Sequence, residues 1–242
     1  MQRALTSITT LLFLFAVTVL PAMAEDEANP ACVPVERNRD RHEGFLKDKE
    51  EALKKGPVDL VFIGDSITDG WRQPPQKHRF DERWGKHNPY NIGISGDQTQ
   101  HVLWRINEGE LDGIKPKLAV VMIGTNNLGN KMTPEQTIGG IECVVKSIQA
   151  KLPETKILLL AVFPRGATSD DPFRAQLKTV NDAIAKLDDG KSVKYLDISS
   201  KFLDEKGALP KDVMPDALHP NEKGYQLWAD AIGETVEQMM EK

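Results

Sequence analysis

The sequence has no surplus of positive charge, no internal repeat and few aromatic side chains. Its 31 lysines and arginines are outnumbered by 36 aspartates and glutamates, which gives a formal net charge of −5. Because these cations form no basic stripe, nucleic acid is not an expected partner. No low-complexity tract or linker divides the 242 residues. We therefore expect one globular domain that is long enough to bury a core of useful size.

Long apolar runs are also scarce, and the longest lies near the N-terminus. Residues 11–20 are apolar, Arg3 precedes them, and residues 21–24 (PAMA) supply small side chains ahead of Glu25. This pattern is typical of a signal peptide that is cleaved on export. A membrane anchor is the alternative, but the run is short for a bilayer span. We predict that residues 1–24 are removed, that the mature protein is periplasmic or secreted, and that it does not stay inserted in a membrane.

Cysteine is almost absent, since the chain contains only Cys32 and Cys143. In an exported protein these two residues could form a disulfide. The alternative is two unrelated thiols, with Cys143 buried in a helix as a small apolar side chain. The sequence leaves both options open.

What the chain does contain is a regular alternation of apolar and amphipathic segments. Residues 25–57 are predicted to be a flexible lead-in and a charged helix, and residues 58–242 are predicted to form the main domain. Apolar, β-branched runs predict buried strands at residues 58–63, 90–94, 118–123, 156–163 and 193–198. Helical patterns occupy residues 36–55, 80–84, 98–107, 134–151, 172–187 and 221–240. This alternation predicts an α/β fold with a five-stranded parallel sheet and helices on both faces.

Polar turns follow the ends of several predicted strands. Ser66 follows the first strand, Gly96 the second and Asn126 the third, while Asp216 and His219 lie between the fifth strand and the last helix. The carboxyl ends of parallel strands share one edge of a sheet, so we expect these five residues to lie together.

These residue types suit nucleophilic catalysis. His219 could take a proton from Ser66, and Asp216 could fix the tautomer of the imidazole. The backbone N–H groups of Ser66 and Gly96, with the amide of Asn126, could stabilise an oxyanion. Each residue also has a structural interpretation: Ser66 as a helix cap, Gly96 and Asn126 as turn formers, and His219 as a solvated side chain. Their joint appearance at strand ends favours catalysis.

Four blocks, GDSIT (64–68), GISGD (93–97), GTNN (124–127) and DALH (216–219), resemble those of the SGNH, or GDSL, hydrolases. The stretch 91–117 is similar to the catalytic subunits of intracellular platelet-activating-factor acetylhydrolases and to exported bacterial proteins of that type. The resemblance implies a flavodoxin-like three-layer α/β/α sandwich and a serine esterase without metal or cofactor. It assigns Ser66 as the nucleophile, Gly96 and Asn126 as oxyanion donors, and Asp216 and His219 as the partners of Ser66.

The resemblance also has implications for substrate and assembly. Animal members of the family form dimers, so a homodimer is one option for this chain. The intracellular animal enzymes lack such a signal peptide. This difference argues against a phospholipid-like substrate for this chain. We expect an exported esterase that hydrolyses short-chain esters, above all acetyl esters, on a carbohydrate or another polar carrier. The alternatives are a thioesterase or lysophospholipase-type lipid ester hydrolase, and a non-catalytic carbohydrate-binding module on the same fold.

Two further residues are candidates for substrate binding. Asp65 adjoins the predicted nucleophile, although holding the turn by hydrogen bonds is its expected role. Arg165 follows the fourth predicted strand and could face the cleft, with a solvated loop arginine as the alternative. No cluster of His, Cys, Asp and Glu has the spacing of a zinc site, so we expect no metal. The pair Gly93 and Gly96 lacks the third glycine of a dinucleotide-binding motif.

Overall fold

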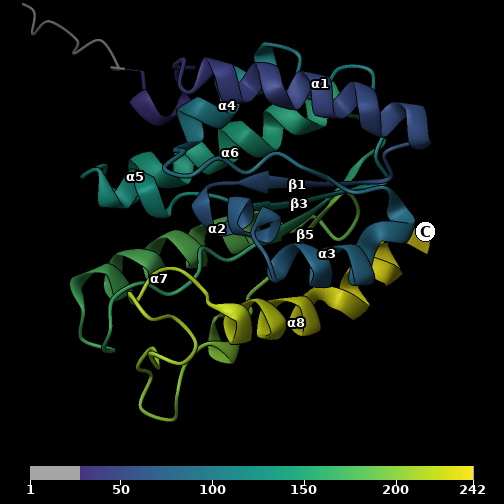
Figure 1. Ribbon diagram of the computed structural model, residues 1–242. Helices are drawn as coiled ribbons and strands as arrows, with labels where there is room; N and C mark the ends of the chain where they lie inside the picture. Colours follow the sequence, from purple (N-terminus) through teal and green to yellow (C-terminus); the bar gives the residue numbers. More distant parts are fainter. Residues whose placement is uncertain (1–27, 242) are drawn as a thin grey trace, which may run out of the picture.

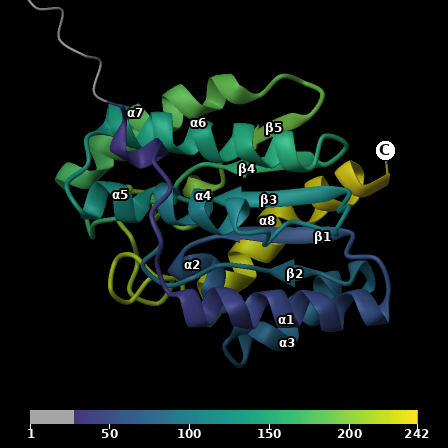
Figure 2. The same ribbon diagram turned by 90° about the horizontal axis from the view of Figure 1, so that it is seen from above.

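The computed structural model of the protein describes residues 28–241. A parallel sheet of five strands, in the order β2-β1-β3-β4-β5, forms the middle layer, and helices cover both of its faces (Figure 1 and Figure 2). The strands are β1 Leu60–Gly64, β2 Tyr90–Asn91, β3 Leu118–Met122, β4 Lys156–Leu160 and β5 Val193–Leu196. The predicted three-layer α/β fold is confirmed. The predicted signal peptide, residues 1–24, lies outside the described residues.

The helices also follow the predicted order along the chain. They are α1 Arg39–Lys55, α2 Ser66–Asp69, α3 Gln76–Trp84, α4 Thr99–Asn107, α5 Thr125–Gly129, α6 Pro134–Lys151, α7 Pro172–Ile184 and α8 Glu222–Glu241. Short 3₁₀ turns are η1 Pro30–Cys32, η2 Gly70–Arg72, η3 Gly85–His87, η4 Ala185–Leu187 and η5 Ser199–Lys201. Among the described residues, no helix has the length and apolar character needed to cross a membrane.

Local sequence explains where the longer helices begin. Thr133 caps α6 by accepting a hydrogen bond from the N–H of Gln136, and Gln136 in turn accepts one from the N–H of Thr133. Such a reciprocal pair satisfies two of the N–H groups that a helix leaves free at its start. Asp171 caps α7 by accepting a hydrogen bond from the N–H of Phe173, and Pro172 follows it at the first helical position, where proline is tolerated.

The core consists of two layers, one on each face of the sheet. In β1, Val61 and Ile63 face the layer formed by α1, α4, α6 and α7, whereas Leu60 and Phe62 face the layer formed by α2, α3 and α8. Successive side chains of a strand point to opposite faces, so a strand buried on both sides must be apolar throughout. Burial on both faces explains why the run of apolar residues in β1 is continuous. The strand ends at Gly64, where the chain reaches the edge of the sheet.

Three local predictions differ from the structure. Residues 28–35 were predicted to be a flexible lead-in, but they contain η1 and are joined to α6 by a disulfide between Cys32 and Cys143, with Cα atoms 5.7 Å apart. The predicted polar turn after β3 is the short helix α5. The second strand was predicted to reach Ile94, but β2 ends at Asn91, where the Asn91 side chain accepts the Gly93 N–H at 2.9 Å and bends the chain.

Candidate active site

Ser66 is the first residue of α2 and lies just beyond the carboxyl end of β1. Asp65 caps this helix, because its Oδ1 accepts a hydrogen bond of 3.0 Å from the backbone N–H of Ile67. The hydroxyl of Tyr225, on α8, donates to the Ile67 carbonyl at 2.7 Å. Gly64 has no room for a side chain, since a Cβ there would lie 2.4 Å from a backbone oxygen of β3. Strand, cap and α8 together hold Ser66 at the sheet edge.

His219 and Asp216 lie in the loop that precedes α8, far from Ser66 in the chain. The Nε2 atom of His219 is 2.9 Å from Ser66 Oγ, and its Nδ1 atom is 2.6 Å from Asp216 Oδ2. Hydroxyl, imidazole and carboxylate therefore stand in the order of a serine triad. When Nδ1 donates to the carboxylate, Nε2 is left as the acceptor that faces the hydroxyl. The structure thus brings together three residues that the sequence singled out.

The loop that carries His219 is bent in an uncommon way. Ala217 has φ 58°, in the left-handed region that is unfavourable for a residue with a Cβ atom. Backbone hydrogen bonds hold it there: the Ala217 N–H donates to the Met214 carbonyl, and the Gly166 N–H donates to the Ala217 carbonyl, both at 3.0 Å. Pro220 disfavours helical geometry at His219. The bend turns the imidazole back toward Ser66 instead of continuing into α8.

Hydrogen bonds keep Asp216 ionised. Partial burial works to raise the pKa of Asp216, but the His219 ring and the backbone N–H groups of His219 and Leu218 donate hydrogen bonds to the carboxylate. Together these donors leave the pKa of Asp216 below its ordinary value. An ionised carboxylate at this position can stabilise the imidazolium that forms when His219 takes a proton.

Gly96 lies in a tight turn beside the end of β1. The Asp97 N–H donates to the Ile94 carbonyl at 3.0 Å, and the Ile94 N–H donates to the Gly64 carbonyl at 3.3 Å. Gly96 has φ 82°, which the third residue of a type II turn requires and which favours glycine. Gly96 is therefore a turn former, as one interpretation held, and the absent side chain also leaves its N–H accessible to a substrate oxygen.

Asn126 is connected to the same turn. Its Nδ2 donates to the Asp97 carbonyl at 2.9 Å, which fixes the orientation of the amide. An amide nitrogen carries two hydrogens, so the second one can serve a substrate oxygen. Gly96 and Asn126 therefore lie next to each other, Gly96 in the turn after β2 and Asn126 in α5 after β3, and these two strands flank β1.

Asp65 lies beneath the site and not at its surface. The residue has no exposed area, and no hydrogen-bond partner for its Oδ2 occurs among residues 28–241. Burial raises the pKa of Asp65 to about 7, because a charge is poorly solvated there. The structure therefore places Asp65 as a support of the nucleophile turn, out of reach of a bound substrate.

Arg165 follows β4 and packs against α5 and α7. Its Nη1 donates to the Thr125 carbonyl at 3.2 Å, and its guanidinium lies 4.3 Å from the centroid of the Phe173 ring. These contacts support the start of α5, next to Asn126, so Arg165 is not a freely solvated loop residue. Its role toward a substrate stays a prediction.

Several supporting residues were missed by sequence reasoning. Asp69 accepts hydrogen bonds from the N–H and hydroxyl of Ser95, at 3.2 and 2.8 Å, and so ties α2 to the Gly96 turn. Its place in the turn after Ser66 was a usable signal. Tyr225 gave no signal, because only folding brings α8 against α2. The same holds for Arg37, which lies beside Gly96.

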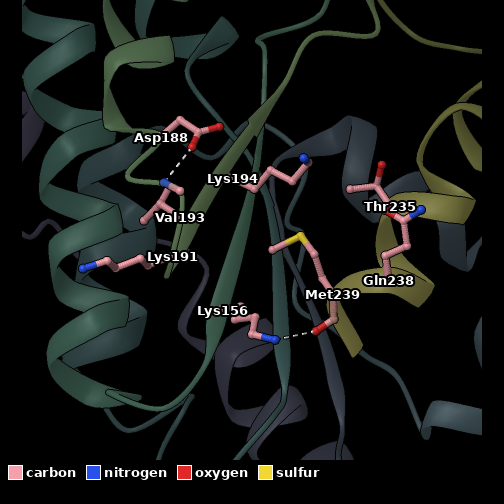
Figure 3. Close-up of a pocket in the computed structure, with 9 residues that line it drawn as sticks. Lys156, Asp188, Lys191, Val193, Lys194, Thr235, Gln238 and Met239 are labelled. Atoms are coloured by element: carbon pink, nitrogen blue, oxygen red, sulfur yellow. Dashed lines mark hydrogen bonds between the residues drawn. The ribbon is translucent and has the colours of Figure 1, made fainter. Parts of the chain in front are cut away.

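The triad is open to solvent. The side chains of His219 and Asp216 are 43% and 56% exposed. A cavity of about 210 Å³ lies at the other end of the sheet, where the first residues of β4 and β5, Lys156 and Val193, meet the end of α8 (Figure 3). This cavity is therefore separate from the candidate site. Within residues 28–241, no group of three or more His, Cys, Asp or Glu is placed to hold a metal ion.

Comparisons with known proteins identify the family of this chain. A model of the GDSL-like lipase/acylhydrolase family matches residues 62–227. The alpha2 subunit of platelet-activating factor acetylhydrolase IB from Homo sapiens is 34% identical over 229 residues, which cover 91% of this chain and 96% of that protein. The human alpha1 subunit is 35% identical over 208 residues, covering 82% and 86%.

Solved structures share the fold at lower identity. A GDSL-like lipase from Bacteroides thetaiotaomicron has a TM-score of 0.63 at 21% identity and covers 81% of this chain and 98% of its own. An acetylxylan esterase from Geobacillus stearothermophilus has a TM-score of 0.60 at 20% identity, covering 75% and 93%. At such identities these two similarities establish the common architecture.

Proposed function

This chain belongs to the GDSL-like lipase/acylhydrolase family and is a carboxylic ester hydrolase; from that premise we propose that it removes acetyl and other short acyl groups from a carbohydrate or another polar carrier. Ser66, His219 and Asp216 carry out the reaction in this proposal. The observation that carries it is the continuous hydrogen-bonded chain from Ser66 Oγ to His219 Nε2, 2.9 Å, and from His219 Nδ1 to Asp216 Oδ2, 2.6 Å.

The proposed reaction proceeds in two halves. His219 takes the hydroxyl proton as Ser66 Oγ attacks the ester carbonyl, and the imidazolium then gives this proton to the leaving alcohol. The acyl group stays on Ser66 as an ester. Water attacks that ester, His219 takes the proton from the water, and Ser66 is regenerated when it receives this proton back. Asp216 stabilises the imidazolium in both halves.

Oxyanion stabilisation is assigned to three donors. The N–H groups of Ser66 and Gly96 and the free amide hydrogen of Asn126 would surround the carbonyl oxygen as it becomes negative. Removing one such donor typically raises the barrier by about 2.7–4 kcal/mol. Ser66 begins α2, so its N–H is also one of those that a helix leaves without an internal partner.

The polar carrier is supported by three observations. The open triad leaves room for a bulky alcohol group, aromatic residues make up only 6% of the chain, and the N-terminus has the pattern of an export signal. The acyl half is supported by the relatives, which are named acetylhydrolases. Platelet-activating factor in those names favours a lipid ester as the second candidate.

Turnover of p-nitrophenyl acetate by wild type, Ser66→Ala and His219→Ala tests the proposal. We expect both variants to lose activity by roughly 10³-fold or more, because Ser66 is the nucleophile and His219 the base of the proposed reaction. Ser200→Ala is the matched control, since Ser200 is exposed and its hydroxyl makes no hydrogen bond within residues 28–241. Equal background rates in wild type and Ser66→Ala would support the non-catalytic binding module, and full turnover in Ser66→Ala would show that Ser66 is not the nucleophile.

The substrate class requires a panel of esters. Acetylated xylan oligosaccharides, p-nitrophenyl esters of increasing acyl length and an acetylated phospholipid are compared by kcat/KM. We expect the highest values for acetyl esters on sugars and a steady fall with acyl length. Faster hydrolysis of the phospholipid would contradict the polar carrier and support the lipid candidate.

A further inference from the structure

Residues 29–37, which we call the anchored segment, lead from η1 across α6 and α4 to the start of α1 (Figure 2). The disulfide between Cys32 and Cys143 joins this segment covalently to α6. Asn29 donates to a backbone carbonyl of α6 at 2.9 Å, and the Val35 N–H donates to a backbone carbonyl of α4 at 3.1 Å. The segment is therefore held along its length.

Two consecutive glycines shape α6 for this contact. A Cβ atom at Gly139 would lie 2.4 Å from Asn29 Nδ2, and one at Gly140 would lie 2.7 Å from the Cβ of Ala31. Ala31 is fully buried between the helices. A glycine inside a helix costs about 1 kcal/mol relative to alanine. Packing of the anchored segment offsets this cost, so the fit of the segment onto α6 is specific.

The segment ends at Arg37, beside the turn that contains Gly96. Nη1 of Arg37 donates to the Ser95 carbonyl at 3.0 Å and to Asp97 Oδ1 at 2.8 Å, so it holds the residues on both sides of Gly96. Nη2 lies over Gly96 itself, where a Cβ would be 2.6 Å away. The buried Asp97 is also bound by Arg105 at 2.9 and 3.1 Å. The turn is thus fixed from the interior by Arg105 and from the outside by Arg37.

A second set of hydrogen bonds connects the segment to Asn126. The Ala31 carbonyl accepts from Thr99 Oγ1 at 2.9 Å, and Thr99 Oγ1 accepts from Asn127 Nδ2 at 2.9 Å. The Thr99 N–H in turn donates to Asn127 Oδ1 at 3.1 Å. Asn127 directly follows Asn126, whose amide donates to the Asp97 carbonyl. The anchored segment therefore contacts the supports of both candidate oxyanion donors, Gly96 in its turn and Asn126 in α5.

We propose that Arg37 is a positioning residue of the oxyanion hole, held in place by the disulfide-anchored segment. The inference rests on the proposed function, because it needs Gly96 and Asn126 to act as donors. Arg37 orients the Gly96 N–H by holding both of its neighbours and does not touch the reacting atoms. A planar guanidinium has enough donors to bridge two acceptors, which a lysine ammonium does less well. Misplacing a catalytic group by about 1 Å can cost roughly a hundredfold in rate.

The test compares Arg37→Ala and Arg37→Lys with wild type, using kcat and KM for p-nitrophenyl acetate. We expect Arg37→Ala to lose roughly tenfold to a hundredfold in kcat with little change in KM, because the oxyanion forms during the reaction and is absent from the bound ester. Arg37→Lys should recover part of the loss. Wild-type kcat in Arg37→Ala overturns the inference, and so does a loss confined to KM, which indicates contact with substrate.

Arg39→Ala is the matched control. Arg39 lies two residues further on, pairs with Glu36 and is 49% exposed, so its removal should leave kcat at the wild-type value. Thermal unfolding of every variant separates misfolding from mispositioning. If Arg37→Ala does not fold, Arg37→Lys decides the question: a lowered kcat in the folded protein supports the inference, and a wild-type kcat overturns it.

The disulfide is tested by a double-mutant cycle. The variant Cys32→Ser/Cys143→Ser should lose kcat, and adding Arg37→Ala to it should cost less than Arg37→Ala costs in wild type, because the two changes act through one contact. Additive losses in kcat would show that the disulfide and Arg37 act independently. Ser66→Ala separates the two proposals: full turnover in it overturns the proposed function together with this inference. Lost turnover in Ser66→Ala with unchanged kcat in Arg37→Ala overturns the inference alone.

Discussion

At the scale of single residues, hydrogen bonds decide which nitrogen of His219 can accept a proton. Asp216 accepts from the Nδ1 side at 2.6 Å and also from two backbone N–H groups. These bonds fix both the ring and the carboxylate, so Nε2 is presented to Ser66 without a search through other orientations. Catalysis should therefore depend on the charge state of His219 and on the acceptor capacity of Asp216.

Acidification should lower kcat/KM, because an imidazolium at His219 cannot act as a base. The change is measured as a pH–rate profile with p-nitrophenyl acetate. A flat profile between pH 5 and 8 would contradict the role of His219.

Asp216→Asn should lower kcat by up to roughly 10⁴-fold, because an amide can leave the imidazole in the wrong tautomer. The measurement is kcat for p-nitrophenyl acetate at neutral pH. Asp212→Asn is the control. Asp212 lies in the same loop as Asp216, is exposed and forms an ion pair with Lys223. Equal losses in the two variants would mean that Asp216 only stabilises the loop.

Asp65 makes stability depend on pH. Burial raises the pKa of Asp65 from 3.8 to about 7, so between those values the folded protein retains a proton that the unfolded chain releases. The contribution of Asp65 to the free energy of unfolding therefore decreases as pH rises from about 4 to 7. In Asp65→Asn this decrease should disappear, because asparagine does not ionise but still accepts the Ile67 N–H.

Urea unfolding at several pH values measures this effect. The free energy of unfolding of wild type should fall more steeply from pH 4 to 7 than that of Asp65→Asn. Asp182→Asn, at an exposed site paired with Lys178, should retain the wild-type slope. Identical slopes in wild type and Asp65→Asn would contradict a proton on buried Asp65.

The candidate nucleophile and oxyanion donors could be predicted from the sequence because parallel strands bring their carboxyl ends to one edge of the sheet. Ser66, Gly96 and Asn126 each follow such an end, so their proximity needed only the strand pattern. Arg37 could not be predicted, since nothing in residues 25–35 indicates that the segment packs on α6. The segment that precedes it is also joined to α6 by the pairing of Cys32 with Cys143, which the sequence left undecided.

At the scale of elements, α6 makes two separate packing contacts. Its buried face packs on the sheet, and Gly139 and Gly140 receive the anchored segment. The helix was predicted with correct bounds, because its cap and apolar period are local signals. The role of Gly139 and Gly140 was not predicted, because their neighbours in the helix do not explain them. Only the packing of the anchored segment on α6 does.

Removing the disulfide should lower the free energy of unfolding by about 2–5 kcal/mol, because the bond closes a long loop in the unfolded chain. The two cysteines are 111 residues apart in the sequence. Denaturant unfolding of Cys32→Ser/Cys143→Ser against wild type measures the change. Dithiothreitol should destabilise wild type and leave the variant unaffected, and equal stability of both proteins without reductant would contradict the expectation.

At the scale of the whole molecule, the candidate active site and the cavity lie at opposite ends of the sheet. The triad and the Gly96 turn lie at the carboxyl end of the strands, and the cavity of Figure 3 lies at the amino end. The open edge suits a substrate whose ester projects from a larger carrier. The position of the site at the carboxyl ends of the strands could be predicted from the alternation of strands and helices. The exposure of the triad could not be predicted, because it depends on loop paths that sequence patterns do not define.

Export can be tested at the N-terminus. Expression of the full chain in a bacterial host should yield a mature protein that begins at Glu25, as read by N-terminal sequencing. Ala24→Gln should block cleavage, because a large side chain does not suit the signal-peptide cleavage site. A soluble product that retains Met1 would contradict the predicted signal.

The disulfide between Cys32 and Cys143 has a practical consequence for anyone who prepares this enzyme. Thiols persist in a reducing cytoplasm and pair in an oxidising compartment. Recombinant material from the two sources would have one sequence and would differ in mass by two hydrogens, and it would also differ in turnover if the disulfide holds Arg37 as proposed. In that case a rate constant measured for this hydrolase reports the cellular compartment in which the sample matured as well as its sequence.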